Sequence, residues 1–457
     1  MNGRIVEKGG LLIFFLALLA FMWAMSRHVY HPTTGEIQTI IPQVFSGDEP
    51  HYLMVVNSIL FDRDLELQDD YRRVGNGSFQ AGVNFKGKWL DHHTILVDPK
   101  SGRTQVWNSV FKLGERETCS GHDCVGFKRM SPEFQDLTDV REFSSHPIGF
   151  PGLIAILLAP FPLALWQVEE GMLVIILIVS WITLVLTYIL ARRLGLTALQ
   201  SLFGVFLLAF ASPWLVYSRS YYAEPILGFF LVLGIFAMSS HRPIFAGLAI
   251  CVALWIKPPF LLVGIGWLLE RFLSREWKQG IYLGLMMGLG GMIFLTFNYF
   301  VTGKLFIGGN ADLTQAWGFP SALTLYDMQY GLLLFVPWLL ILMVGGVAFL
   351  LNNLKIGPEA TIFVRQVWIS SLLFFLLISA YIYLGGSCYG PRFWVPFLPL
   401  FAVATILFVV QAGKFIQWLA WGLGILSVFI AIPGAIFYRN VWDQGPFAGL
   451  RILLPHF

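Results

Sequence analysis

The sequence predicts an all-α polytopic membrane protein with about eleven transmembrane helices and a long external loop after the first of them. Apolar residues make up 56% of the 457 residues, charged residues only 12%, and the mean hydropathy is +0.69. Soluble domains of this length do not bury so much apolar surface. The charges are unevenly spread, because 17 of the 27 acidic residues and 13 of the 30 basic ones lie between Arg27 and Pro147. That segment is therefore the water-exposed part.

The first apolar helix follows a short basic N-terminus. Arg4 and Lys8 precede the run 9–25, which is roughly long enough to cross a bilayer. No small-x-small cleavage site follows this run, so we expect an uncleaved first span and not a signal peptide. The two basic residues place the start of segment 1–25 in the cytoplasm. The polar segment 26–147 is then external.

Further spans are predicted at ten apolar runs, which cover about 171–191, 200–217, 224–239, 243–256, 258–270, 279–301, 329–351, 362–384, 392–410 and 415–437. Residues 171–437 thus form a transmembrane bundle, and residues 438–457 follow it as an external tail. The run 148–166 is ambiguous because it carries three prolines, and proline interrupts the backbone hydrogen bonds that lipid requires. We expect an in-plane helix there; the alternative is a twelfth span.

Counting basic residues decides between those two topologies. If the run 148–166 lies in the membrane plane, the basic residues outside the long loop divide into eleven inside and six outside; if it spans, the division is eight and nine. Cytoplasmic loops carry an excess of Lys and Arg, so the in-plane topology is favoured. The eleven are Arg4, Lys8, Arg192, Arg193, Arg242, Arg271, Arg275, Lys278, Lys355, Arg365 and Lys414.

The six basic residues left outside lie in distinctive sequences. They are Arg219, Lys257, Lys304, Arg392, Arg439 and Arg451. The first four belong to the segments Ser218–Pro225, Trp255–Pro259, Thr302–Lys304 and Gly385–Phe393. Charges near membrane depth are costly and usually functional. These segments therefore predict a single site on the external side, which they share with the polar segment.

Two adjacent acids, Asp48 and Glu49, stand near the start of the polar segment. Adjacent carboxylates can divide labour, with one as a general base and the other held by hydrogen bonds. Gly47 and Pro50 shape a turn around the pair, and an amphipathic stretch begins at Tyr52. The residues alone support a catalytic pair and a solvated pair of loop acids about equally.

Arg219, Lys257 and Arg392 are candidates to bind a phosphate, because Arg offers a bidentate fork and Lys a compact charge. The alternative is that each is a snorkelling residue at a helix end. At Lys257 the two alternatives are about equally supported, since Pro258 breaks the helix and leaves carbonyls for the amine. Gly-rich and aromatic neighbours favour a functional Arg392. Glu224 opens a helix, where it either complements the helix dipole or binds substrate.

The polar segment also predicts some local structure. A surface helix is expected for residues 52–67, and a small β-hairpin for residues 82–102, closing at Asp98 to Gly102. Residues 74–142 are expected to select the acceptor, because loops carry specificity on a rigid scaffold. A disulfide is favoured between Cys119 and Cys124, since the loop faces an oxidising compartment. Potential metal ligands lack the full four-ligand spacing of a metal site; they are Asp91, His92, His93, Cys119, His122, Asp123 and Cys124.

The donor substrate is expected to be carried by lipid. No Gly-rich nucleotide loop occurs in the sequence, which argues against a soluble sugar nucleotide or ATP. The net charge of +3 is too small to suggest nucleic acid as a partner.

Taken in order, these motifs resemble those of the GT-C superfamily of integral-membrane glycosyltransferases, which includes the protein O-mannosyltransferases and the bacterial transferase that adds aminoarabinose to lipid A. The pair Asp48-Glu49 matches the acidic pair of the external loop in that superfamily. His146-Pro147 resembles the start of a His-Pro-Pro surface helix, although Ile148 replaces the second proline. The segments 218–224, 255–258 and 386–392 resemble further elements of the superfamily. The first loop is unusually long for these relatives.

The resemblance implies transfer of a sugar from a polyprenyl-phosphate donor, such as one built on undecaprenyl phosphate, to a hydroxyl of a glycan, lipid or protein acceptor. It implies Asp48 as the general base, Glu49 as the residue that positions a substrate, and Lys257 with Arg392 as stabilisers of the lipid phosphate. No cofactor or metal is expected to be required. The resemblance also implies that the protein lies in a bacterial inner membrane, with its active site on the periplasmic face. Further substrate-binding residues are expected to be His51, Tyr52, His146, Arg219, Tyr222, Glu224 and Tyr389.

Two other functions would use similar features. A lipid-linked sugar transporter or flippase would also have external charges near membrane depth, but it is expected to show paired repeats and ionisable residues at mid-membrane. Neither is visible in the sequence. An O-antigen ligase or polymerase would use a lipid donor and a long external loop, but that loop would lie late in the chain. Here the long loop lies early.

Overall fold

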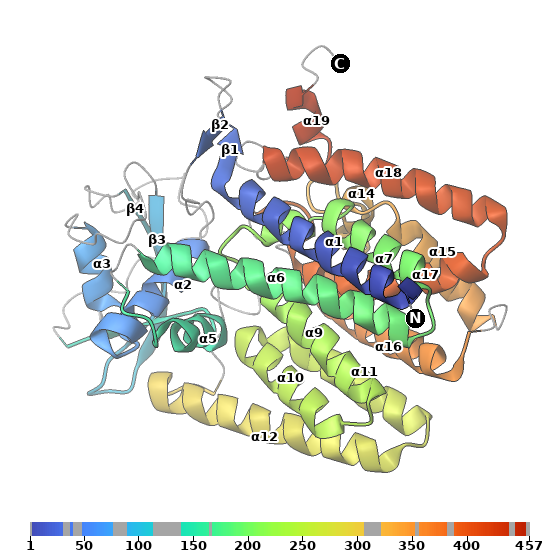
Figure 1. Ribbon diagram of the computed structural model, residues 1–457. Helices are drawn as coiled ribbons and strands as arrows, with labels where there is room; N and C mark the ends of the chain where they lie inside the picture. The colour runs from blue at the N-terminus through green and yellow to red at the C-terminus, as the bar shows by residue number, and fades with distance from the viewer. Residues whose placement is uncertain are drawn as a thin grey trace.

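A computed structural model describes residues 2–30, 37–39, 48–75, 89–112, 139–163, 167–305, 321–351, 356–381, 388–437 and 444–453. Helices dominate this part of the chain, and the strands form two small antiparallel sheets. Figure 1 shows the long helices side by side, with the N-terminus at one end of the bundle and the compact polar segment at the other.

Six helical segments of the described chain are long and apolar enough to cross a membrane. They are α1 (Asn2–Arg27), α6 (Gln167–Arg193), α12 (Trp277–Thr302), α16 (Pro358–Ala380), the continuous η4 (Arg392–Phe397) and α17 (Leu398–Gln411), and α18 (Lys414–Ile436). Shorter apolar helices are α5 (Gly149–Leu158), α7 (Ala198–Phe210), α9 (Glu224–Ser239), α10 (Pro243–Ile256) and α15 (Leu339–Leu350). Short or less apolar connecting helices are α8 (Trp214–Tyr217), η3 (Pro258–Phe260), α11 (Leu261–Leu273), α13 (Leu323–Tyr326), α14 (Leu332–Phe335) and α19 (Ala448–Leu453). The predicted number of eleven spans stays a prediction.

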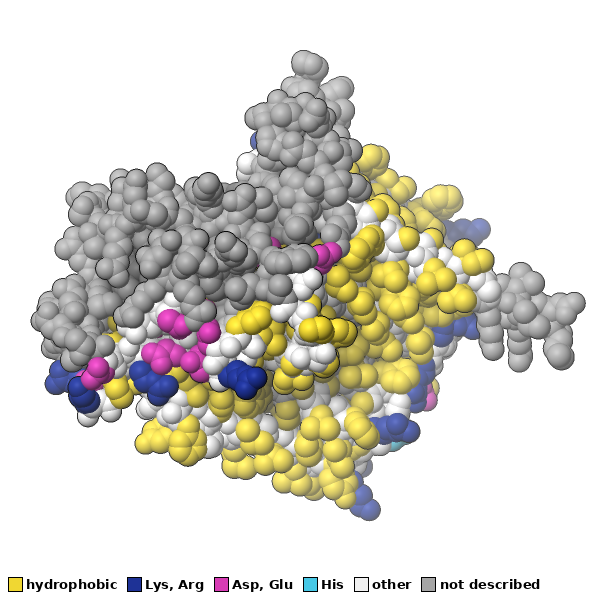
Figure 2. Space-filling view, turned by 60° about the vertical axis from the view of Figure 1, so that its left-hand side comes forward, with side chains coloured by type: hydrophobic (Ala, Val, Ile, Leu, Met, Phe, Trp, Pro, Cys, Tyr) yellow, Lys and Arg dark blue, Asp and Glu magenta, His cyan; other side chains and the backbone are white. Residues whose placement is uncertain are grey.

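Large apolar side chains cover the flank of the bundle. Figure 2 shows a broad hydrophobic surface, with charged side chains gathered toward its edges. Phe300 on α12 is 82% exposed, and Phe415 on α18 is 77% exposed. Water-soluble monomers rarely expose contiguous apolar surfaces of such extent. The chain is therefore an integral membrane protein, and the predicted all-α polytopic class is confirmed.

The helix α17 lies at the centre of the bundle. It packs against α6, α7, α9, α15 and α16, and its residues Leu398 to Val409 are all buried. A helix that is apolar on every side belongs inside a protein or in lipid. Here the central helix starts directly after η4, so the bundle core fixes the position of Arg392.

The polar segment contains α2 (Asp48–Asn57), the π-helical turn η1 (Ser58–Asp62), α3 (Gln68–Gly75) and a three-stranded sheet. The strands β3 (Trp89–Val97), β4 (Thr104–Lys112) and β5 (Arg141–Ser144) are antiparallel in the order β4-β3-β5. Trp89 pairs with Lys112, and Ile95 pairs with Phe143. A second, two-stranded sheet joins β1 (His28–Tyr30) and β2 (Ile37–Thr39).

The predicted β-hairpin exists, and its turn lies at the predicted place. Asp98 accepts a hydrogen bond from the Lys100 backbone nitrogen at 2.9 Å and one from the Ser101 hydroxyl at 2.5 Å. The second strand, however, follows the turn, so the hairpin covers residues 89–112 and not 82–102. Asp and Ser side chains stabilise such turns locally, which is why the turn could be predicted from the sequence.

The predicted surface helix over residues 52–67 is wrong at both ends. The helix α2 starts at Asp48, because acids are stabilised at a helix N-terminus and Pro50 is tolerated in the first turn. It ends at Asn57 and is continued by η1 to Asp62, and the helical segment stops at Arg63, which has a φ of 63°. Residues 49–57 are all buried, since α2 packs against α5 and α6. The pair Asp48-Glu49 therefore opens a buried helix.

The ambiguous run 148–166 begins with α5, whose ten residues extend about 15 Å, half the thickness of the hydrocarbon core of a bilayer. Its in-plane placement and the domain limits stay predictions. Several other predictions lie outside the described residues. The Cys119–Cys124 disulfide and the side chains of His92 and His93 are among them.

Candidate active site

Four charged side chains from distant parts of the chain form one ion-pair network. The Nη2 atom of Arg392 lies 2.5 Å from Oδ2 of Asp48, and its Nε lies 2.8 Å from Oε1 of Glu224. Lys257 forms an ion pair with the same oxygen of Glu224. Two carboxylates and two cations thus balance in formal charge.

The network is buried on one side and open on the other. The side chains of Glu224 and Arg392 are 0% and 3% exposed, whereas those of Lys257 and Asp48 are 16% and 21% exposed. A buried ion pair keeps its geometry because either partner alone would be an uncompensated charge. The exposed members, Asp48 and Lys257, are therefore the ones that a substrate can reach.

Each member of the network lies at the end of a helix. Asp48 and Glu224 open α2 and α9, where the helix dipole stabilises a carboxylate. Lys257 ends α10, since Pro258 and the next proline cannot continue that helix. Arg392 opens η4 after Gly390, whose φ of 61° glycine adopts without steric cost. The ends of four elements therefore meet at one level of the bundle.

Glu49 faces the protein backbone. Its side chain is completely buried, and Oε1 accepts a hydrogen bond from the backbone nitrogen of Tyr221 at 2.9 Å. This contact joins α2 to the segment that leads into Glu224. The two adjacent acids therefore differ in their surroundings, because Asp48 is partly exposed and Glu49 is not.

A group of histidines and tyrosines borders Asp48. Nε2 of His146 lies 3.9 Å from Oδ1 of Asp48. The ring of His146 is stacked on His51 at 5.7 Å between centroids, and it lies 5.5 Å from the ring of Tyr52. His51 in turn is 2.7 Å from the hydroxyl of Tyr71. These contacts fix the ring of His146 beside the carboxylate.

Two tyrosines surround the guanidinium of Arg392. Its Cζ lies 4.0 Å from the ring centroid of Tyr222, a cation–π contact. Burial, assisted by the negative charge of Asp48, raises the pKa of the Tyr52 phenol well above its ordinary value, although Arg392 opposes this shift. Tyr52 is therefore neutral near pH 7 and can act as a hydrogen-bond donor. Lys257 also lies 5.5 Å from the ring centroid of Phe393.

Arg219 and Tyr389, both predicted as substrate-binding residues, make contacts with α18. Nη1 of Arg219 donates to the carbonyl of Ala435 at 3.0 Å, at the end of α18 where carbonyls lack partners within the helix. The hydroxyl of Tyr389 donates to the carbonyl of Ile430 at 3.4 Å. Both of these predicted site residues are therefore connected to α18.

Two residues of the site, Tyr71 and Gly149, were not predicted from the sequence. Tyr71 orients His51, but it lies twenty residues further along the chain and no motif marks it. Gly149 lies against the carbonyl group of Trp255, and any Cβ there would approach it to well under 3.0 Å. This contact places α5 beside the end of α10. The glycine could have been noted from its place after His146-Pro147.

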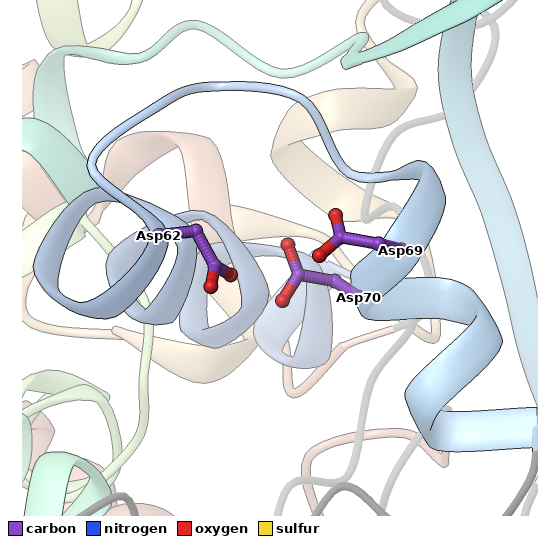
Figure 3. Close-up of side chains that lie close together, drawn as sticks. All are labelled: Asp62, Asp69 and Asp70. Carbon is purple, nitrogen blue, oxygen red and sulfur yellow. The ribbon is translucent and has the colours of Figure 1, made fainter.

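Three carboxylates in the polar segment lie close enough to hold a metal ion. One oxygen from each of Asp62, Asp69 and Asp70 falls within 4.8 Å of the others. Figure 3 shows the carboxylates pointing toward one another from η1 and the start of α3. Each of the three also interacts with other groups of the protein. This acidic group lies apart from the ion-pair network in sequence, and no motif predicted it.

No protein-family model matches the chain, and no curated protein matches its sequence. Among solved structures, ArnT from Cupriavidus metallidurans in the apo state is similar over 98% of this chain and 74% of that chain, with a TM-score of 0.50 and 12% identity. The chain has the fold of ArnT. ArnT bound to undecaprenyl phosphate matches over 97% of this chain and 76% of that chain, with a TM-score of 0.49 and 12% identity.

The ArnT fold confirms the GT-C-like architecture that the sequence resemblance implied. At 12% identity the likeness to ArnT concerns the fold alone.

Proposed function

We propose that this chain is a glycosyltransferase that moves a sugar from a polyprenyl-phosphate donor to an acceptor hydroxyl on the external, periplasmic face of the membrane. The ion-pair network carries this proposal, because it sets a reachable carboxylate, Asp48, beside the two cations of Lys257 and Arg392. The fold supports it as well. ArnT, which has the same fold, binds undecaprenyl phosphate, and that lipid is a polyprenyl phosphate.

The proposed reaction is a single displacement. The acceptor hydroxyl oxygen forms a bond to the anomeric carbon, and the bond from that carbon to the phosphate oxygen breaks with its electron pair on the phosphate. Asp48 takes the proton of the hydroxyl as general base. Arg392 holds Oδ2 of Asp48, so Oδ1 is the oxygen that takes this proton.

The cations stabilise the phosphate as it leaves. Negative charge develops on the bridging oxygen, and fixed positive groups near such an oxygen can supply the largest share of catalysis. Lys257 is a compact charge that can reach a phosphate oxygen, whereas the buried Arg392 adds a fixed positive charge beside Asp48. Glu224 holds both cations through one oxygen and so keeps them in place before the donor binds.

Asp48→Asn tests the proposed function. In liposomes that contain a polyprenyl-phosphate sugar and an acceptor extract, this variant should lose transfer by a factor of about 10²–10⁴, the usual contribution of a general base. The variant should stay folded, because the amide keeps the shape of the carboxylate and Arg392 still pairs with Glu224. Sugar transfer is measured by thin-layer chromatography of labelled product.

The matched control is Glu359→Gln, which removes an exposed carboxylate from the first turn of α16. It should leave transfer unchanged. Near-normal turnover by Asp48→Asn would remove Asp48 as the base. Absence of transfer by the unaltered protein from every polyprenyl-phosphate sugar offered would contradict the proposed function itself.

A further inference from the structure

The two oxygens of Asp48 face different partners. Oδ2 lies 2.5 Å from Nη2 of Arg392, whereas Oδ1 lies 3.9 Å from Nε2 of His146. A separation of 3.9 Å is longer than a hydrogen bond, but catalytic contacts in ligand-free enzymes are often long and tighten when substrate binds. The oxygen that would take a proton from the acceptor is therefore the one that faces a histidine.

His146 is held in this orientation by its neighbours. Its ring is stacked on His51 with an interplanar angle of 30°, and its backbone nitrogen donates to Oγ of Ser144 at 3.1 Å. The ring of Tyr52 contacts it from α2. An imidazole fixed in this manner can exchange a proton with Asp48 without a large movement.

A small cavity lies beside His146. It is lined by His146, by the polar residues Ser144, Asn298 and Thr302, and by apolar residues that include Val55. Its volume is about 30 Å³, and roughly 10–15 Å³ is enough for one water molecule when polar partners are present. The cavity can therefore hold water beside the imidazole.

We propose that His146 is a positioning residue for proton transfer: it receives the proton of the acceptor hydroxyl from Asp48 and releases it to water in this cavity. The inference rests on the proposed function. In the proposed step, the proton passes from Oδ1 of Asp48 to Nε2 of neutral His146, which becomes an imidazolium. The imidazolium then releases the proton from Nε2 to water of the cavity, which restores Nε2 as an acceptor and leaves Asp48 as the carboxylate that the next acceptor needs.

The relay would return Asp48 to its charged form after each turnover. After each turnover Asp48 would be protonated, and a neutral Asp48 cannot serve as base or pair with Arg392. Histidine is suited to receive the proton because it changes charge near neutral pH. The titratable or charged groups that face His146 include Asp48, His51 and Tyr52, with Arg392 behind Asp48.

The test is the pH profile of kcat for His146→Gln in reconstituted liposomes. In the unaltered protein, kcat should fall at acidic pH, because an imidazolium cannot accept a proton. The variant should be about 10–100-fold slower, below the full contribution of a general base, and its acidic limb should be lost. The KM for the donor should change less than about two-fold, because His146 does not hold the phosphate. Imidazole in the buffer should restore part of the activity of His146→Gly.

The control is His241→Gln. His241 lies in the loop between α9 and α10 and contacts Gln279 of α12, so its replacement should leave kcat and its pH profile unchanged. If His146→Gln does not fold, His146→Asn replaces it in the same measurement. A variant that keeps the acidic limb, or one that slows without rescue by imidazole, would overturn the relay and leave the proposed function intact. If the unaltered protein transfers no sugar, the proposed function fails and not the relay alone.

Discussion

At the scale of single residues, the site is organised by differences in burial. Asp48 and Glu49 are adjacent in sequence, yet one carboxylate is 21% exposed and the other is completely buried against a backbone nitrogen. Lys257 and Arg392 differ in the same way, since only Lys257 is appreciably exposed. Each pair thus combines a residue that substrate can reach with a residue that the protein holds. Lys257 is accordingly the cation that we expect to contribute most to donor affinity.

Lys257→Met tests that expectation. The variant keeps much of the length of the side chain but loses the charge, while Arg392 still neutralises Glu224. A hydrogen bond to a charged group contributes about 1.5–3 kcal/mol, so affinity for undecaprenyl phosphate should fall by about 10–100-fold. Binding is measured by thermophoresis in detergent.

The matched control is Lys304→Met, an exposed lysine after α12 that is predicted to lie on the same side of the membrane. Its loss should leave the affinity unchanged. Equal weakening by both variants would mean that lysine charge acts at long range and not through a direct contact of Lys257 with the phosphate. Unchanged affinity in Lys257→Met would refute the role of Lys257 in binding the donor phosphate.

At the scale of elements, the sequence predicted that a helix or hairpin forms better than it predicted the residues at which that element begins and ends. The hairpin turn at Asp98 could be predicted because its hydrogen bonds are local. The start of α2 could not, because Gly47 and Pro50 are typical of turns and also of helix N-termini. The burial of α2 depends on α5 and α6, which lie a hundred residues away in sequence. No local pattern carries that information.

Gly149→Ala tests how the packing of α5 positions the site. A Cβ at this position would press against the carbonyl group of Trp255, two residues before Lys257. The helix α5 would then move away from α10, and His146 would move with it. Overpacking of this kind costs about 1–3 kcal/mol, so both the melting temperature and the transfer rate should fall.

Gly152→Ala is the control within the same helix. Its Cβ would meet only Cγ1 of Ile148 at an ordinary 3.7 Å, and alanine is about 1 kcal/mol more favourable than glycine inside a helix. The control should therefore be as stable as the unaltered protein or more so. A Gly149→Ala variant with normal melting and normal transfer would show that the contact of α5 with α10 does not position the site.

At the scale of the whole molecule, apolar runs and the placement of charge were the informative signals. Most of the apolar runs coincide with helices of the described bundle, because runs of that length in lipid must satisfy their own backbone hydrogen bonds, whereas the runs 200–217 and 329–351 are each divided into two helices. The count of basic residues placed Lys257 and Arg392 on the side of Asp48, and the structure joins these residues in one network. The same count placed Arg219 on that side as well. Sidedness does not determine which helix a side chain contacts, and Arg219 contacts the end of α18.

The predicted sidedness can be tested along a single helix. The 26 residues of α12 extend about 39 Å, more than the roughly 30 Å of a hydrocarbon core, so its two ends lie on opposite sides of the membrane if it spans. Lys278 near its start and Lys304 after its end are both exposed. The basic-residue count assigns Lys278 to the cytoplasm and Lys304 to the external face.

Each lysine is replaced by cysteine in a background whose four native cysteines are serine, and intact cells are treated with a membrane-impermeant maleimide. Lys304→Cys should be labelled at once, and Lys278→Cys only after the membrane is permeabilised. The reverse pattern would place Asp48 and its cations on the cytoplasmic side, where a periplasmic acceptor could not reach them. Because the two sites belong to one helix, equal labelling of both would show instead that α12 does not cross the bilayer.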